Sequence, residues 1–105
     1  MSELIIITTT SDTVDVLDRI ADRVVGDRLA ACCQISQPIK SVYRWEGKIE
    51  SSSEFELKIK TAAEKFDEVS IVIKSLHNYD VPQIVAVNVV HADDAYRDWA
   101  NANLS

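Results

Sequence analysis

In the middle of the chain the sequence runs Ser41-Val42-Tyr43-Arg44-Trp45-Glu46-Gly47-Lys48 and then, after Ile49-Glu50-Ser51-Ser52-Ser53-Glu54, Phe55-Glu56-Leu57-Lys58-Ile59-Lys60. The second segment alternates apolar and charged residues, which is typical of a strand with one buried face. The first segment is rich in aromatic and β-branched residues, which also favour strands. Gly47 permits a positive φ, and with Ser51-Ser52-Ser53 it predicts a long connection between two antiparallel strands.

Upstream of this hairpin, the residues predict one strand followed by one helix. The segment Leu4-Ile5-Ile6-Ile7-Thr8-Thr9-Thr10 is apolar and β-branched, which favours a strand buried on both faces. Ser11 and Asp12 offer side-chain oxygens to the free N–H groups at the start of a helix. Apolar residues then recur at helical spacing until Gly26, which weakens or ends the helix.

The remaining elements complete a recognisable order. They are expected at Ala31 to about Trp45 (a strand, with Pro38 at a sheet edge or bulge), Ala63 to Leu76 (a helix), Ile84 to Val90 (a buried strand) and after Asp93 or Asp94 (a short helix). The order β-α-β-β-α-β is that of the ferredoxin-like, split βαβ arrangement. We therefore predict an α+β fold, with one antiparallel sheet, both main helices on one face and a short C-terminal helix.

Length and charge limit the organisation and the partners. A chain of 105 residues is expected to be a single domain, residues 1–105. Its net charge of −6 repels phosphates, so neither nucleic acid nor an anionic membrane is an expected partner. No apolar stretch is long enough to span a membrane, and Met1-Ser2-Glu3 lacks the positive start of a secretory signal. Together with two adjacent cysteines, a poor disulfide framework, this predicts a cytoplasmic protein.

The sheet predicts self-association. Its face opposite the two helices carries apolar side chains, and no second layer remains in the sequence to cover them. Packing against further copies of the same chain is the natural solution.

The quoted segments, with Leu29-Ala30-Ala31-Cys32-Cys33, Leu57-Lys58-Ile59-Lys60-Thr61 and His77-Asn78-Tyr79-Asp80-Val81-Pro82-Gln83-Ile84, resemble the CutA family of divalent-cation tolerance proteins. The resemblance extends from Ile5 to Trp99. It implies a homotrimer of PII-like architecture, with three sheets packed around a threefold axis and strands extended across subunits. We expect the long hairpin from Arg44 to Glu54 to be the arm for such pairing. It also implies a non-enzymatic role in divalent metal tolerance, with copper(II) or another divalent cation as the ion and no organic cofactor.

Two residues are candidate metal ligands. His77, at the end of a predicted helix, is either a ligand or a structural histidine whose charge suits the helix C-terminus. Cys32 is either a soft ligand or, like Cys33, an inert core thiol, because the spacing does not describe a zinc site. Some CutA proteins carry a cysteine and a second histidine at the positions of Thr8 and Leu76, so the resemblance implies weaker copper binding here.

Six further residues match family positions that form an intersubunit cleft: Tyr43, Trp45, Glu54, Lys60, Tyr79 and Trp99. Either they bind a ligand, or Glu54 and Lys60 form a structural ion pair while the aromatic residues pack the trimer. A PII-like signalling or scaffold trimer is therefore the alternative function. It would bind a partner protein or a small anionic ligand at the cleft through Lys60, Arg44 and Tyr79. No trio of nucleophile, base and orienting group can be recognised from spacing, so an enzyme is not predicted.

Overall fold

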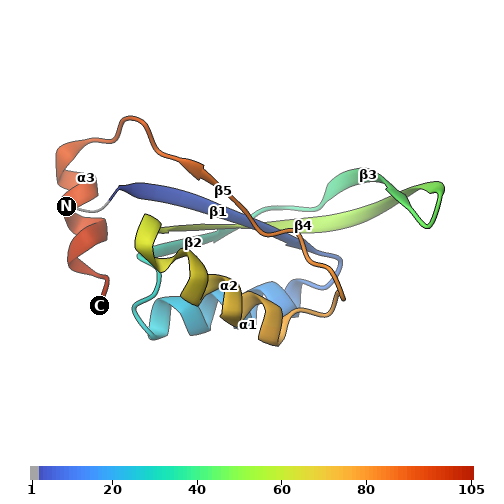
Figure 1. The fold of residues 1–105 in the computed structure, drawn as a ribbon, viewed down its shortest axis with the longest axis horizontal. Helices are drawn as coiled ribbons and strands as arrows, with labels where there is room; N and C mark the ends of the chain where they lie inside the picture. Colours follow the sequence, from blue (N-terminus) through green and yellow to red (C-terminus); the bar gives the residue numbers. More distant parts are fainter. Residues whose placement is uncertain (1–2) are drawn as a thin grey trace.

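A computed structural model describes residues 3–105; Met1 and Ser2, which begin the segment considered for a secretory signal, lie outside the described residues. Within that range the chain forms one antiparallel sheet and three α-helices (Figure 1). The elements are β1 (Leu4–Ser11), α1 (Val14–Gly26), β2 (Cys32–Ile35), β3 (Ile39–Trp45), β4 (Lys48–Ala62), a 3₁₀ turn η1 (Ala63–Lys65), α2 (Phe66–Leu76), β5 (Val85–Asn88) and α3 (Asp94–Ala102).

The strand order is β2-β4-β1-β5, and β3 pairs with the part of β4 that extends beyond β1. Every one of these pairings is antiparallel. Helices α1 and α2 lie side by side on one face of the sheet, and α3 lies at the end where β1 begins (Figure 1). The antiparallel sheet and the placement of both main helices on one face are confirmed, and so is the predicted βαββαβ order, except that its second strand is divided into β2 and β3.

The strand predicted from Ala31 to Trp45 is wrong in one respect, because it is broken into β2 and β3 around Pro38. Proline has no N–H to donate to a ladder, so pairing stops there. Ser36 bridges the break, since its N–H donates to the Glu56 carbonyl and its Oγ accepts from the Glu56 N–H, each at 2.9 Å. The 15-residue strand β4 continues unbroken and carries β3 on one end and β1 on the other.

The connection between β3 and β4 is much shorter than predicted. It consists of two residues, Glu46 and Gly47, both with positive φ (50° and 78°). Two residues in this conformation match the twist of a hairpin, so the strands pair immediately on either side. Ser51 to Ser53 therefore lie inside β4, opposite Lys40 to Val42, and not in a loop.

The core lies between the sheet and the helices. Alternate residues of the paired strands, Ile5 and Ile7 on β1 with Leu57 and Ile59 on β4, point toward α1 and α2. The helices contribute a stripe of fully buried residues: Leu17, Ile20, Val24, Val69 and Ile73. Each such side chain stabilises the fold by about 1.5–3 kcal/mol of transfer free energy. The prediction that β1 is buried on both faces is confirmed for the helix side, whereas Ile6 and Thr8 on the opposite side are only half-buried.

The helix starts differ in how well they were predicted. Asp93 caps α3 as expected, because its carboxylate accepts the Tyr96 N–H at 3.2 Å. The prediction for α1 is wrong: the capping position is Thr13, which makes no side-chain capping bond. Ser11 Oγ accepts the Thr13 N–H at 3.1 Å, one residue too early to cap. The helix predicted to begin at Ala63 begins as η1 and becomes α-helical at Phe66.

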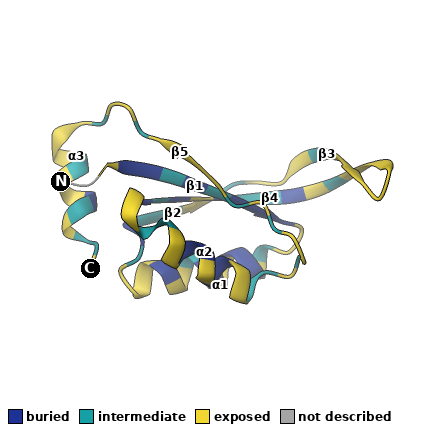
Figure 2. Ribbon diagram, viewed as in Figure 1, coloured by how far each residue is buried: buried dark blue, intermediate teal, exposed yellow. Residues whose placement is uncertain are grey.

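Strand β5 was predicted to be buried, and this is wrong for the single chain. All four of its residues are exposed (Figure 2). The strand pairs only with β1, so it lies at a sheet edge. The register places Val85 beside Thr8 and Val87 beside Ile6, on the face opposite the helices. Helix α3 covers only the end of that face, where Ala100 packs against Leu4 and Ala31. Val85 and Val87 lie beyond that contact and are 49% and 59% exposed.

The β3–β4 hairpin makes the molecule long. The chain measures 45 × 25 × 23 Å, with a radius of gyration of 14.3 Å, above the roughly 13 Å expected for a compact domain of this size. The outer half of the hairpin extends past the rest of the sheet as an arm (Figure 1). Val42, Trp45 and Ile49 on this arm are exposed.

Candidate functional site

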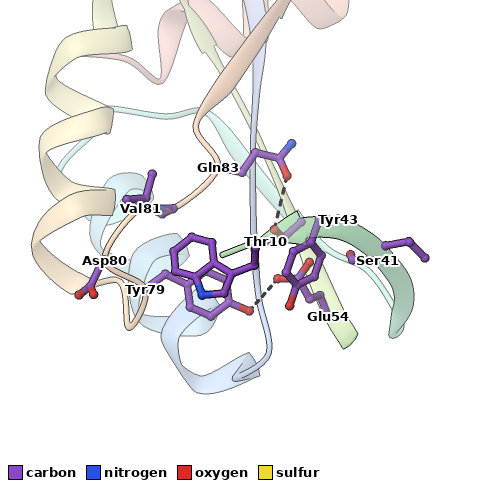
Figure 3. Close-up of a pocket in the computed structure, with 11 residues that line it drawn as sticks. Thr10, Ser41, Tyr43, Glu54, Tyr79, Asp80, Val81 and Gln83 are labelled. Atoms are coloured by element: carbon purple, nitrogen blue, oxygen red, sulfur yellow. Dashed lines mark hydrogen bonds between the residues drawn. The ribbon is translucent and has the colours of Figure 1, made fainter. Parts of the chain in front are cut away.

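A pocket of about 670 Å³ opens where three segments meet: the end of β1, the base of the hairpin arm, and the loop after α2 (Figure 3). Its lining residues are Thr10, Ser41, Val42, Tyr43, Trp45, Glu54, Tyr79, Asp80, Val81, Pro82 and Gln83. The volume is in the range of pockets that hold small molecules. Most of the lining is apolar or aromatic, with a few polar groups among it.

His77 attaches the loop after α2 to the sheet. Its Nδ1 accepts the Tyr79 N–H at 3.0 Å, so this nitrogen carries the lone pair. Its Nε2 lies 2.8 Å from the Thr10 carbonyl oxygen and therefore carries the proton that it donates. Both ring nitrogens are therefore hydrogen-bonded. The imidazole has a structural role at the C-terminus of α2, where it fixes the loop that follows.

Asn78 fastens the same loop to the junction between β1 and α1. Its side-chain oxygen accepts the Ser11 hydroxyl at 2.7 Å, and its Nδ2 donates to the Asp12 carboxylate at 2.9 Å. Together with the bonds of His77, these contacts hold the loop at two points of β1. The loop wall of the pocket is thus anchored by side chains that lie outside the pocket itself.

Tyr79 also anchors the loop, and unlike His77 and Asn78 it lines the pocket itself. Its hydroxyl accepts the Asp12 N–H at 2.9 Å and donates to Glu54 Oε2 at 2.7 Å (Figure 3). Burial raises the pKa of the Tyr79 hydroxyl above its ordinary range, donation to Glu54 raises it further, and the Asp12 N–H partly opposes both effects. Tyr79 therefore remains a neutral donor to Glu54 under ordinary conditions.

The pocket is acidic. Glu54 is only 7% exposed, although its carboxylate lines the pocket, and Asp80 adds a second carboxylate at the exposed side. Among the described residues, the lining contains no lysine, arginine or histidine. The field inside this pocket therefore favours positive charge.

The structure brings together four of the six residues predicted for the cleft: Tyr43, Trp45, Glu54 and Tyr79. The other two lie elsewhere, near α3. The Lys60 ammonium is 5.5 Å from the centre of the Tyr96 ring, and Trp99, itself on α3, packs against Tyr96 with the ring centres 5.6 Å apart and the rings tilted by 38°. Glu54 and Lys60 are not paired with each other in the described chain.

The two candidate metal ligands are not brought together either. His77 contacts Thr10 near the far end of β1, whereas Cys32 pairs with Lys60 on β4, opposite Ile6. Within residues 3–105 no three of the histidine, cysteine, aspartate and glutamate side chains are grouped so as to hold an ion. Since both nitrogens of His77 are already bonded, the donors of one chain do not fit a preformed metal centre.

Both thiols are free and half-buried. Cys33 packs against the helix-side core, and burial raises its pKa to about 12, with Cys32 and Asp22 adding smaller effects. A thiol in this state is neither a ready nucleophile nor a ready ligand, which agrees with the structural alternative considered for it.

Sequence reasoning missed several lining residues, among them Thr10, Asp80 and Gln83. Thr10 lies within the strand segment already recognised, and its hydroxyl donates weakly to Gln83 at 3.4 Å (Figure 3). The other two lie in the run from His77 to Ile84, which contributed to the sequence-based predictions only through its resemblance to the CutA family. The order of residues within this loop does not indicate that the loop faces the hairpin arm.

The split βαβ sheet and its acidic aromatic pocket define a small α+β protein with a candidate binding pocket between the loop after α2 and the hairpin arm. A sequence model for the family described as CutA1 divalent ion tolerance protein matches residues 5–103. The divalent-cation tolerance protein CutA of Archaeoglobus fulgidus is 41% identical over 90 residues, covering 86% of this chain and 87% of that protein. Its Thermus thermophilus counterpart is 37% identical over 103 residues, covering 98% of each.

Solved structures give the same result. The crystal structure of CutA from Xylella fastidiosa matches with a TM-score of 0.94 at 33% identity, covering 99% of this chain and 100% of that one. The structure of CutA from Archaeoglobus fulgidus matches with a TM-score of 0.93 at 37% identity, covering 97% and 99%. The chain therefore belongs to the CutA family of divalent-cation tolerance proteins.

Proposed function

We propose that this protein acts in divalent-cation tolerance as a homotrimer of PII-like architecture and catalyses no reaction. The family supports the role in cation tolerance. The observation that carries the assembly is the uncovered apolar face of the sheet, with Val85 and Val87 on β5 and further apolar residues on the hairpin arm. A monomer rarely leaves such an area in water, and identical copies can cover it symmetrically.

Sedimentation equilibrium on the purified protein tests the assembly. We expect a mass of three chains, each of 11.7 kDa, at micromolar concentration. A monomer at all concentrations would contradict the proposal.

Copper(II) is the ion that we propose. Of the two candidate donors His77 is the better one. Its Nδ1 lone pair accepts only the Tyr79 N–H, so it can bind the ion once that one hydrogen bond is broken. Cys32 is half-buried and has no second donor grouped with it in residues 3–105. Water or a second copy of the chain must complete the coordination, so binding is weaker than at a preformed site.

Calorimetric titration of the metal-free protein with Cu(II), and with Zn(II) for comparison, tests this contact. His77→Ala should abolish the saturable part of the Cu(II) binding. His91→Ala is the matched control, because His91 is exposed, and it should bind as the original chain does. Equal binding by all three proteins would eliminate His77 as the contact.

A cytoplasmic location is also proposed, supported by the two free cysteines, since disulfides are rare in that compartment. The family is not uniform in this respect: the relative from Arabidopsis thaliana is named as chloroplastic, and the solved Archaeoglobus fulgidus protein is described as periplasmic. No helix in the described chain is long and apolar enough to cross a membrane. Fractionation of the source cells with a specific antibody tests the location.

A second candidate function is the binding of a small molecule, as in a signalling or scaffold trimer, and the pocket favours it. The cavity is large enough, its lining is mostly apolar, and its loop wall is anchored by His77, Asn78 and Tyr79. Thermal denaturation with a panel of charged and neutral metabolites tests this function, since a ligand of the native state raises the midpoint.

A further inference from the structure

The buried carboxylate of Glu54 indicates which class of small molecule the pocket between the loop after α2 and the hairpin arm would bind. We propose that the pocket binds a small organic cation, an ammonium or guanidinium group carried on an apolar body. This proposal rests on the ligand-binding function and specifies the class of ligand. It differs from the anionic ligand expected from the sequence, because Lys60 and Arg44, the expected contacts, do not line the pocket.

The first argument is an incomplete set of partners. A carboxylate has about four acceptor sites, and a buried one is stable only when its charge is compensated. Glu54 is 93% buried, yet the described residues give it a single hydrogen bond, from the Tyr79 hydroxyl at 2.7 Å. That donor is neutral. A cation in the pocket would supply both the missing charge and further N–H donors.

The second argument is the aromatic lining. Tyr43, Trp45 and Tyr79 all border the same pocket as Glu54. Tyr43 and Trp45 are 43% and 52% exposed in the single chain, so the pocket that one copy forms presents their surfaces to a ligand. Aromatic faces attract ammonium and guanidinium groups through their negative quadrupole and also cover an apolar body. The same faces offer an anion no comparable attraction, and Asp80 and Glu54 repel it.

The third argument is that part of the site is already ordered. The Tyr79 hydroxyl is held by the Asp12 N–H and by Glu54, and its backbone N–H is held by His77. The rings of His77 and Tyr79 also pack with their centres 4.8 Å apart. A ligand that uses this wall pays little for ordering it, which favours measurable affinity for a small molecule.

Three probes of one shape test the charge preference: phenethylammonium, phenethyl alcohol and phenylacetate. Isothermal titration of the full chain at low salt should show the ammonium binding at least about tenfold tighter than the alcohol, with phenylacetate weakest. Glu54→Gln keeps the shape and can still accept from Tyr79, so we expect it to reduce the preference to about threefold or less. Glu50→Gln is the matched control, because Glu50 is an exposed glutamate on the same strand outside the pocket lining.

Several results would overturn the proposal. Tighter binding of phenylacetate would disprove the cationic class while leaving the ligand-binding function intact, whereas no binding of any probe or metabolite would disprove both. If no ammonium binds and Glu54→Gln weakens self-association, a side chain of a second copy supplies the cation. Should Glu54→Gln not fold, Asp80→Asn must lower the affinity for the ammonium and leave that for the alcohol unchanged.

Discussion

At the scale of single residues, Tyr79 does the most to join separate parts of the chain. One hydroxyl group links the start of the first helix, through Asp12, to the base of the hairpin arm, through Glu54. These contacts span 67 and 25 positions of sequence. Together with His77 and Asn78 the tyrosine holds the loop after α2 in place, and it donates the only described hydrogen bond to the buried Glu54 carboxylate.

Tyr79→Phe removes this hydroxyl, and we expect it to lower the free energy of unfolding by about 1–3 kcal/mol, because Glu54 loses its donor while it stays buried. Urea denaturation at a fixed protein concentration measures the change. Tyr43→Phe is the control: its hydroxyl makes one exposed bond to Ser52 at 3.3 Å, so its effect should stay below about 0.5 kcal/mol. Equal effects of the two variants would show that the Tyr79–Glu54 bond contributes little.

Cys33 is expected to be unreactive while the chain is folded. Burial, with Cys32 and Asp22, raises its pKa from 9.0 to about 12, which lowers its thiolate fraction near pH 8 by roughly a thousandfold. In a Cys32→Ser variant, iodoacetamide should therefore modify Cys33 far more slowly in native than in urea-unfolded protein. Comparable rates in the two states would contradict the burial of this thiol.

The same shift has a consequence for stability in alkali. A folded-state pKa above the unfolded value means that the folded chain favours the protonated thiol. The resulting stabilisation is complete below about pH 9 and is lost as the pH rises from 9 through 12. The raised pKa of Tyr79 acts with the same sign, beginning near its ordinary value of 10.0.

At the scale of elements, the two-residue turn determines the geometry of the hairpin arm. Glu46 and Gly47 both adopt positive φ, and this makes it possible for β3 and β4 to pair from Trp45 and Lys48 outward. Only glycine adopts such a conformation without a steric penalty.

Gly47→Ala should lower the free energy of unfolding by about 1–2 kcal/mol, because alanine at a φ of +78° is strained even though its added methyl group meets no atom within 4 Å. Gly26→Ala is the matched control. It also has open space but no positive φ, and it ends α1, so alanine there should be neutral or stabilising by up to about 1 kcal/mol. Thermal or urea unfolding of the two variants should give opposite signs; the same sign for both would refute the conformational explanation.

At the scale of the whole molecule, the two faces of the sheet differ. One face is packed against α1 and α2, while the other, with the hairpin arm, leaves apolar side chains open (Figure 2). The elongated shape results from that arm. Both features are costly for an isolated chain and favourable for a symmetric assembly, in which the arm and the open face can be covered.

Val87→Asp places a charge on the open face, where Val87 is 59% exposed in the single chain. If that face is the interface, burying an unpaired carboxylate should weaken association on the order of 100-fold or more, which analytical ultracentrifugation will detect. Ile71→Asp is the control, since Ile71 is 67% exposed on α2, on the helix side of the sheet. It should leave the assembly unchanged, and equal effects of both variants would exclude the open face as the interface.

Much of the fold was predictable because local patterns carry it. These patterns are the alternation of apolar and charged residues in β4, the helical spacing of apolar residues, and the strand break, turn and helix start at Pro38, Gly47 and Asp93. Each of them depends only on residues a few positions apart in the sequence. These sufficed for the element order and for the sheet with helices on one face. Their errors are local as well: the break at Pro38, the shorter turn and the displaced start of α1 each depend on backbone hydrogen bonds that composition does not record.

The pocket could be predicted only in part. Four of its residues were recognised, but Thr10, Asp80 and Gln83 were not, and the acidic character was missed because Lys60 was expected beside Glu54. Short-range pattern determines which segments are strands and helices, since it acts through backbone geometry and apolar spacing within one element. Which side chains share a pocket, which nitrogen of His77 is bonded and which valines stay open depend on contacts between residues far apart in the chain, and only the folded structure decides these.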